Sequence, residues 1–214
     1  MRVGRFADRR AAGRELAEHL TLYAGREDVI VLGLPRGGVP VAHEVAASLQ
    51  APLDVLLVRK LGVPGREELA FGAIASGGVR VLNDDVVSQA RLGAATVERI
   101  AASELRELER RDLLYRGDRP AIDVQGRTAL LVDDGLATGA TMRAAAQAVR
   151  ELGAGTVIVA VPVAARQTCE ELTRHADIVV CARTPDPFVA VGLWYRDFSP
   201  TTDDEVRELL ELGR

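Results

Sequence analysis

Two adjacent acids, Asp133 and Asp134, follow the four apolar residues 129–132 and precede a loop of small residues at 135–141. The apolar run is typical of a buried parallel strand, and the pattern over 142–152 predicts a helix after the loop. Glycines let such a loop turn tightly, and its threonine hydroxyls would lie beside the free NH groups of the helix N-terminus. A strand, loop and helix of this kind can bind a phosphate monoester.

The two acids are not expected to bind that phosphate, because like charges repel. They are suited to accept hydrogen bonds from sugar hydroxyls, or to hold a hydrated magnesium ion through water, and no direct protein ligand to a metal is predicted. Phosphate, hydroxyls and metal together indicate a sugar phosphate. An ordinary strand and helix with a capping Asp would explain one acid and one glycine, but not the whole string.

A second glycine-rich turn, Pro35-Arg36-Gly37-Gly38, lies between an apolar strand and a helical pattern over 39–49. Any α/β fold can place a glycine-rich turn there, but an Arg between Pro and two glycines is less generic. Small neighbours leave the Arg36 guanidinium and several backbone NH groups available to bind an anion.

Two adjacent cations, Arg59 and Lys60, end the apolar strand 53–58, at the edge where open α/β sheets bind ligands. The following residues, 61–69, are rich in Gly and Pro and predict a mobile loop, with a plain surface loop as the alternative. Glu68 lies in this loop beside an apolar run. Loop closure would carry it into a dry pocket as a proton acceptor, unless it is simply a solvated charge.

The length of 214 residues predicts a single α/β domain over 1–214. Strands alternate with helices, which predicts a parallel sheet with helices on both faces. With 27 basic and 31 acidic residues the net charge is −4, so nucleic acid is not an expected partner. There is no membrane-length apolar run and no signal-like amino end, so we expect a cytoplasmic protein whose Cys169 and Cys181 are buried thiols.

Helical spacing predicts an entry helix over 8–23, in which Arg9 belongs to a solvated surface. Residues 71–76 and 79–82 predict two strands joined by a hairpin turn. A long charged helix is predicted over 96–115, packing on the domain or on a second subunit. A homo-oligomer is expected. The segment 185–198 holds four of the eight aromatic residues, suited equally to stacking on a planar base or to a small satellite core.

The string from Val132 to Met142 resembles the phosphoribosyl pyrophosphate (PRPP) signature of type I phosphoribosyltransferases, especially the adenine enzymes. The Pro35-Arg36 turn is similar to the pyrophosphate loop of that family, which often has a strained or cis peptide. Residues 59–65 are similar to the start of its flexible loop. Phe188 and Val189 loosely resemble the hood of the hypoxanthine-guanine enzymes, where an aromatic ring stacks on the purine.

The resemblance implies a type I phosphoribosyltransferase fold with a small hood built largely from 183–200. It implies magnesium-dependent transfer of ribose 5-phosphate between PRPP and a nitrogenous base, a purine or pyrimidine, in nucleotide salvage. The implied catalytic residues are Arg36, Arg59, Lys60 and Glu68. The implied substrate-binding residues are Gly37, Gly38, Asp133, Asp134, Gly135, Leu136, Ala137, Thr138, Gly139, Thr141, Phe188, Val189 and Trp194.

Ala137 stands where hypoxanthine-guanine enzymes carry an Asp, so a general base is absent at that position. The alternative is a non-catalytic protein of the same fold that senses PRPP. A hydrolase or pyrophosphokinase relative is a further alternative that the single motif leaves open.

Overall fold

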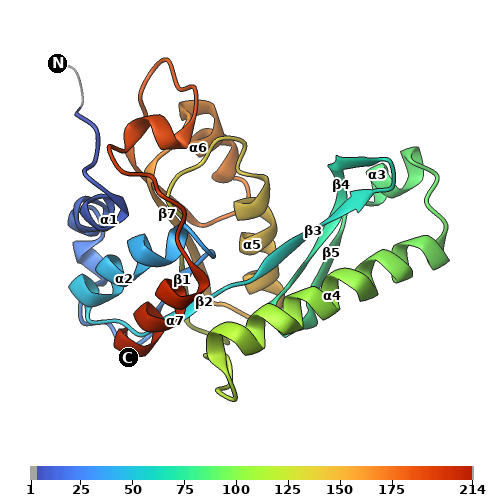
Figure 1. The fold of residues 1–214 in the computed structure, drawn as a ribbon, viewed down its shortest axis with the longest axis horizontal. Coiled ribbons are helices and arrows are strands. Elements are labelled where there is room, and N and C mark those ends of the chain that lie inside the picture. The colour runs from blue at the N-terminus through green and yellow to red at the C-terminus, as the bar shows by residue number, and fades with distance from the viewer. Residues whose placement is uncertain (1–3, 214) are drawn as a thin grey trace.

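The computed structural model describes residues 4–213, without the side chains of residues 67 and 68. Five parallel strands form the central sheet in the order β2-β1-β6-β7-β8, and three antiparallel strands, β3-β4-β5, form a smaller sheet beside it (Figure 1). The elements up to the middle of the chain are α1 (Arg9–Glu18), η1 (Thr21–Tyr23), β1 (Val29–Gly33), α2 (Gly38–Leu49), β2 (Leu53–Val55), β3 (Val58–Val63), β4 (Arg66–Ala75), η2 (Ser76–Gly78), β5 (Arg80–Leu82), α3 (Asp84–Gln89) and α4 (Ala94–Arg116). The later elements are β6 (Thr128–Val132), α5 (Ala140–Glu151), β7 (Thr156–Val163), α6 (Arg166–Leu172), β8 (Ile178–Arg183), η3 (Val191–Trp194) and α7 (Asp203–Leu212).

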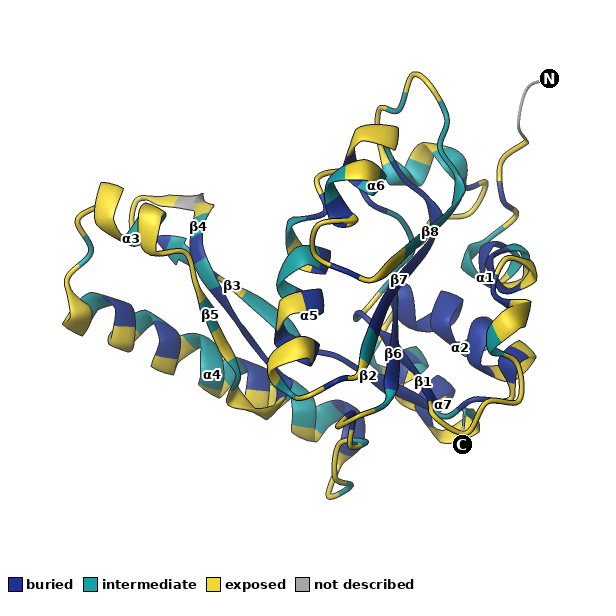
Figure 2. Ribbon diagram, turned by 180° about the vertical axis from the view of Figure 1, so that it is seen from behind, coloured by how far each residue is buried: buried dark blue, intermediate teal, exposed yellow. Residues whose placement is uncertain are grey.

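Helices cover both faces of the central sheet, as the alternation of apolar segments predicts. Successive side chains of a strand point to opposite faces, so Val31 and Leu130 pack with α1, α2, α4 and α7. Ile30 and Leu131 pack with α5 and α6 on the other face. Strands β1 and β6 are buried along their whole length (Figure 2). The predicted fold class is therefore confirmed.

Strands β3 to β5 and helices α3 and α4 form an arm, residues 58–116, that projects from the side of the core (Figure 1). Its inner side chains, Leu61, Phe71 and Ile74, belong to the same buried cluster as Leu108 of α4. This cluster is continuous with the face of the core that carries α1 and α2. The arm is therefore packed onto α4, and α4 is packed onto the core.

The prediction of a mobile loop over 61–69 is wrong, because these residues are the facing strands of a hairpin. β3 and β4 pair as antiparallel strands, with a register shift on either side of Gly62. Leu61 and Phe71 are fully buried between the small sheet and α4. Burial of these side chains outweighs the low strand preference of the nearby Gly and Pro residues, of which only Pro64 and Gly65 form the turn.

The single strand predicted over 53–58 is divided between two sheets. β2 ends at Val55, and Val58 begins β3 in the arm. Arg59 and Lys60 consequently lie inside an arm strand rather than at the end of a core strand. Composition alone could not place the break, because both halves are apolar.

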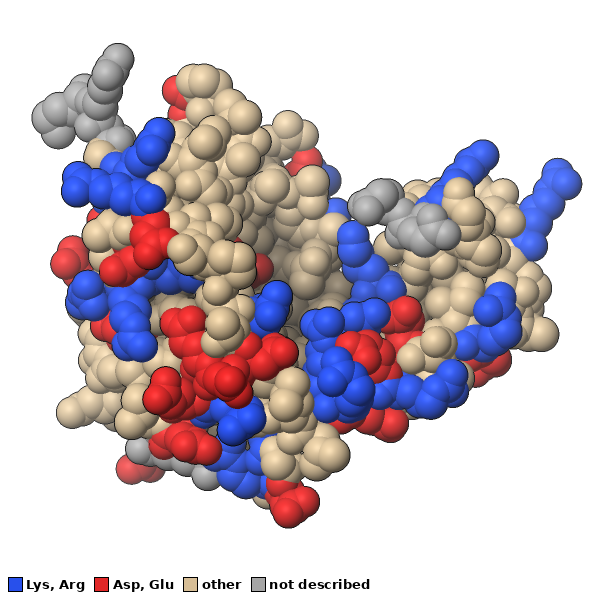
Figure 3. Space-filling view, in the orientation of Figure 1, with Lys and Arg blue, Asp and Glu red and all other residues tan. Residues whose placement is uncertain are grey.

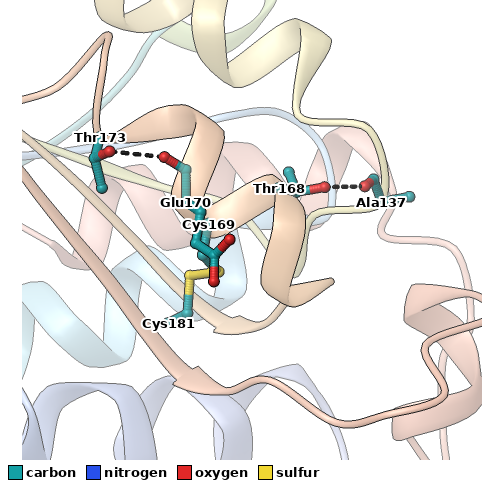
Figure 4. Close-up of a disulfide and its surroundings, with 6 residues drawn as sticks. All are labelled: Ala137, Thr168, Cys169, Glu170, Thr173 and Cys181. Carbon is teal, nitrogen blue, oxygen red and sulfur yellow. Dashed lines mark hydrogen bonds between the residues drawn. A yellow bond between two sulfur atoms is a disulfide. The ribbon is translucent and has the colours of Figure 1, made fainter.

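Cys169 and Cys181 form a disulfide between α6 and β8 (Figure 4), so the prediction of two separate thiols is wrong. The residues are 12 apart in sequence, and β8 returns beside α6 so that the sulfurs meet. The spacing of the two cysteines along the chain does not predict that β8 lies beside α6. Next to the disulfide, the Thr168 hydroxyl donates to the Ala137 carbonyl at 2.6 Å, so α6 is linked to the loop after β6.

Other expectations agree with the structure. Asp8 caps α1 by accepting a hydrogen bond from the Ala11 NH at 2.7 Å. β4 and β5 form the predicted hairpin. Within residues 4–213, no helix combines the length and the apolar character needed to cross a membrane.

The arm joins the core through a buried ion pair between Arg116, near the end of α4, and Asp54 of β2. Arg116 Nε donates to Asp54 Oδ1 at 2.9 Å, and both side chains are almost fully buried. The other Asp54 oxygen accepts from the Ile122 NH at 3.0 Å, and Arg116 also donates to the Val55 carbonyl. One buried charge cluster thus connects α4, β2 and the chain that leads into β6.

Asp54→Asn is expected to lower the free energy of unfolding by about 1.5–3 kcal/mol, because Arg116 loses its buried carboxylate partner and keeps only Asp112, which is partly exposed. Urea unfolding followed by circular dichroism measures this change. Asp204→Asn is the control, because Asp204 is 90% exposed and pairs with Arg207 at the surface, where such pairs contribute little. Equal stability of Asp54→Asn and the wild type would contradict the structural role of the pair.

Candidate functional site

The loop between β6 and α5 has the geometry of an anion site. Leu136 is buried and its NH donates to the Val163 carbonyl at 3.0 Å, which fixes the middle of the loop. Gly139 has φ +66°, and a Cβ there would lie 2.8 Å from Thr168 Cγ2, so this position requires glycine. Thr138 and Thr141 are exposed at the N-terminus of α5. The loop therefore presents hydroxyls and helix-end NH groups to solvent.

The turn after β1 lies directly against the loop after β6. The Leu34 NH donates to the Val132 carbonyl at 2.9 Å. A Cβ on Gly37 would lie 2.1 Å from Asp134 Oδ2, and a Cβ on Gly38 would lie 2.8 Å from Asp133 Cα. Glycine is required at position 38, where a Cβ would meet backbone atoms, and a Cβ at position 37 would displace the Asp134 carboxylate. The Pro35–Arg36 peptide is cis, as the family resemblance implies for this turn.

The two acids differ in their partners. Asp133 Oδ1 accepts from the Asp134 NH at 2.8 Å, whereas Asp134 Oδ2 accepts from Arg9 Nε, also at 2.8 Å. Burial and then the charge of Asp134 raise the pKa of Asp133 well above its usual range. Burial also raises the pKa of Asp134, and the hydrogen bond and charge of Arg9 oppose that rise. The positive charge of Arg9 thus partly offsets the negative charge of the two acids.

Arg9 was predicted to lie on a solvated surface, and that prediction is wrong. Its side chain is 11% exposed, because the N-terminus of α1 lies beside the acids. Tyr195 also contacts the acid pair, and the sequence around Tyr195 does not predict this contact. Its hydroxyl donates to the Asp134 carbonyl at 2.5 Å, and burial, then the charge of Asp134, raise the pKa of Tyr195.

Arg36 extends from the first turn toward α7. Its Nη1 lies 3.9 Å from Asp203 Oδ1, and about half of the side chain is exposed. Asp203 also accepts from the Tyr115 hydroxyl at 2.6 Å, and burial together with this bond raises the pKa of Tyr115 to about 12. The guanidinium therefore lies at the open side of the turn with one loose acidic neighbour.

The arm carries cations to the loop after β6. Arg59, Lys60 and Thr141 line one cavity of about 540 Å³, and Arg99 of α4 lines it as well. Figure 3 shows the hollow between core and arm, with basic side chains gathered on the side of the arm. Arg59 Nε is bound to Glu104 Oε2 at 2.5 Å, which orients it from α4. The structure thus brings the two predicted cations to the predicted loop, although from a different sheet.

The aromatic residues of 185–198 lie on the core. Phe188 and Trp194 pack against a satellite cluster that includes Phe6 and Tyr195, whose ring centroids are 5.3 Å apart. Val189 is 73% exposed. These contacts support the satellite-core interpretation, and stacking on a base stays a prediction, as does a hood from 183–200. Glu68 was the predicted proton acceptor, and its side chain lies outside those that the structure describes.

Comparison with known proteins agrees with this geometry. The model of the phosphoribosyl transferase domain matches residues 4–195. A protein of Mycobacterium tuberculosis named "putative phosphoribosyl transferase" is 54% identical over 206 residues, which cover 96% of this chain and 46% of that protein. The chain thus spans about half the length of the curated relative that it matches.

The crystal structure of TT1426 from Thermus thermophilus has a TM-score of 0.86 and 47% identity, and the match covers 96% of this chain and 97% of that one. The family model spans most of the chain, including both glycine-rich loops and the adjacent acids. The chain therefore belongs to the phosphoribosyl transferase domain family.

Proposed function

We propose that the protein is a magnesium-dependent phosphoribosyltransferase, which moves ribose 5-phosphate between PRPP and a nitrogenous base. The observation that carries this proposal is the packing of Asp133 and Asp134 against Gly38 and Gly37. It joins two anion loops at one edge of the sheet, with carboxylates between them. A sugar that carries a phosphate at one end and a pyrophosphate at the other fits this order of groups.

Each part of PRPP has a proposed partner. The loop 135–141 binds the 5-phosphate through NH groups and threonine hydroxyls. Asp133 accepts the ribose hydroxyls, because its carboxylate is the one without the Arg9 contact. Gly37 and the Arg36 guanidinium bind the pyrophosphate, together with Arg59 and Lys60 of the arm.

A hydrated magnesium ion fits the acid pair. Among the side chains that the structure describes, no group of three or more His, Cys, Asp or Glu is placed to hold a metal ion. We propose that an ion carried by the pyrophosphate would contact Asp133 or Asp134 through water. When bound, magnesium neutralises charge on the leaving group.

In the proposed reaction the bond from C1 of the ribose to the pyrophosphate oxygen breaks, and a bond from C1 to the base nitrogen forms. Arg36 and the arm cations stabilise the negative charge that develops on the departing pyrophosphate. The nitrogen loses a proton, and Ala137 cannot accept it. We propose Glu68 of the arm hairpin as the acceptor.

The proposal predicts pyrophosphate release when the protein is incubated with PRPP, magnesium and a panel of purine and pyrimidine bases. A coupled pyrophosphate assay measures release, and calorimetry measures PRPP binding. Asp133→Asn should weaken PRPP binding about 10- to 100-fold, because it removes charged hydrogen bonds to the ribose. Circular dichroism checks that this variant is folded.

Two outcomes would count against the proposal. PRPP binding without turnover on every base would favour a non-catalytic sensor of the same fold. Absence of PRPP binding by the wild type would remove the substrate assignment itself.

Glu68→Gln should lower the turnover number by roughly 100-fold with little change in KM, because it removes the base and preserves shape. Steady-state kinetics with the preferred acceptor measures both constants. The matched control is Glu67→Gln, one residue away on the same strand, which should turn over at the wild-type rate. If Glu68→Gln also does so, the proton leaves by another route.

A further inference from the structure

We infer that Arg9 is a positioning residue for PRPP binding, which acts by holding Asp134 in place between the two anion loops. This inference rests on the proposed function. Arg9 is the first residue of α1 and lies outside both loops. It is 125 residues from its partner Asp134 in the sequence.

The Arg9 guanidinium, carried by α1, contacts the acid pair and the segment before α7. Nε donates to Asp134 Oδ2 at 2.8 Å, and Nη1 donates to the Ser199 carbonyl at 2.7 Å. The guanidinium carbon also lies 4.0 Å from the centre of the Phe198 ring. One side chain thus connects α1, the acid pair and the segment before α7, and each contact restricts where the others can lie.

Burial makes the contact with Asp134 important. The side chains of Arg9 and Asp134 are 11% and 15% exposed, so water screens the pair poorly. Removing one member of a buried ion pair leaves the other charge without compensation. Without Arg9, an ionised Asp134 carboxylate would turn toward solvent to regain hydration. This moves it away from Gly37, against which it now packs.

Charge gives a second reason for an effect on PRPP. Asp133 and Asp134 together carry two negative charges when both are ionised, and Arg9 reduces their sum to one. PRPP is a polyanion, so the remaining charge on the pair opposes its approach. Loss of Arg9 should therefore weaken PRPP binding by misplacing one acid and by increasing repulsion.

A double-mutant cycle of Arg9→Met and Asp134→Asn tests this inference, with the PRPP dissociation constant measured by calorimetry. Arg9→Met should weaken PRPP binding about 10-fold or more in the wild-type background. In the Asp134→Asn background the same substitution should change the constant less than about threefold, because the carboxylate through which Arg9 acts is gone. Arg9→Lys should recover part of the loss, because one ammonium can pair with Asp134 but cannot also reach Ser199 as the planar guanidinium does.

Arg10→Met is the matched control. Arg10 neighbours Arg9 on the same helix, but its side chain is 45% exposed and lies 3.6 Å from Glu44. It should bind PRPP as the wild type does. If Arg9→Met is too unstable to measure, Arg9→Gln replaces it in the cycle, because it also removes the charge that pairs with Asp134, and it should show the same dependence on Asp134.

The outcomes separate this inference from the proposed function. A wild type that binds PRPP, with equal losses from Arg9→Met in both backgrounds, would overturn the positioning role and leave the proposed function intact. The same holds if Arg9→Met binds as tightly as the wild type, or if Arg10→Met loses as much affinity. A wild type that fails to bind PRPP would overturn both.

Discussion

The parallel pairing of β1 with β6 is the constraint on which the candidate site depends. Gly33 lies opposite Val132 in this pairing, so both strands end at the same level of the sheet. The turn after β1 and the loop after β6 must then leave the sheet side by side. They can pack closely only because Gly37 and Gly38 yield the space that the two acids occupy. A side chain on Gly38 would separate the two loops, and one on Gly37 would displace the Asp134 carboxylate.

The arm adds the second half of the site under a different constraint. Its strands do not pair with the central sheet, so packing on α4 and on α5 must hold Arg59 and Lys60 near the loop after β6. Helix α4 is in turn joined to β2 by the buried pair of Arg116 and Asp54. A substitution that breaks the pair of Arg116 and Asp54 would displace the cations of the arm without altering either loop of the core.

The sequence predicts those parts of the fold that depend on local pattern. The strand, loop and helix around Asp133 follow from four apolar residues, two acids and a glycine-rich run, and each lies where predicted. The central sheet follows from the alternation of strands and helices. The same patterns mislead at 61–69, where Gly and Pro indicate a loop but buried Leu61 and Phe71 stabilise a hairpin. There tertiary packing outweighs local preference.

Residues that act across long separations could not be predicted in this way. Arg9 has the pattern of any charged residue at the start of a helix, and only the approach of α1 to the acids distinguishes it from Arg10. Cys169 and Cys181 have no spacing that marks a pair, and the return of β8 beside α6 brings them together. Tyr195 contacts Asp134 because the fold brings together residues that are 61 apart in the sequence.

We propose that two separate anion sites lie side by side at one edge of the sheet. Calorimetric titration of pyrophosphate into the protein, first alone and then saturated with ribose 5-phosphate in the presence of magnesium, tests it most directly. Two separate sites predict that pyrophosphate still binds to the saturated protein, with one equivalent taken up in each titration. Displacement of ribose 5-phosphate by pyrophosphate would show that the two ligands compete for one site, and would contradict two separate sites.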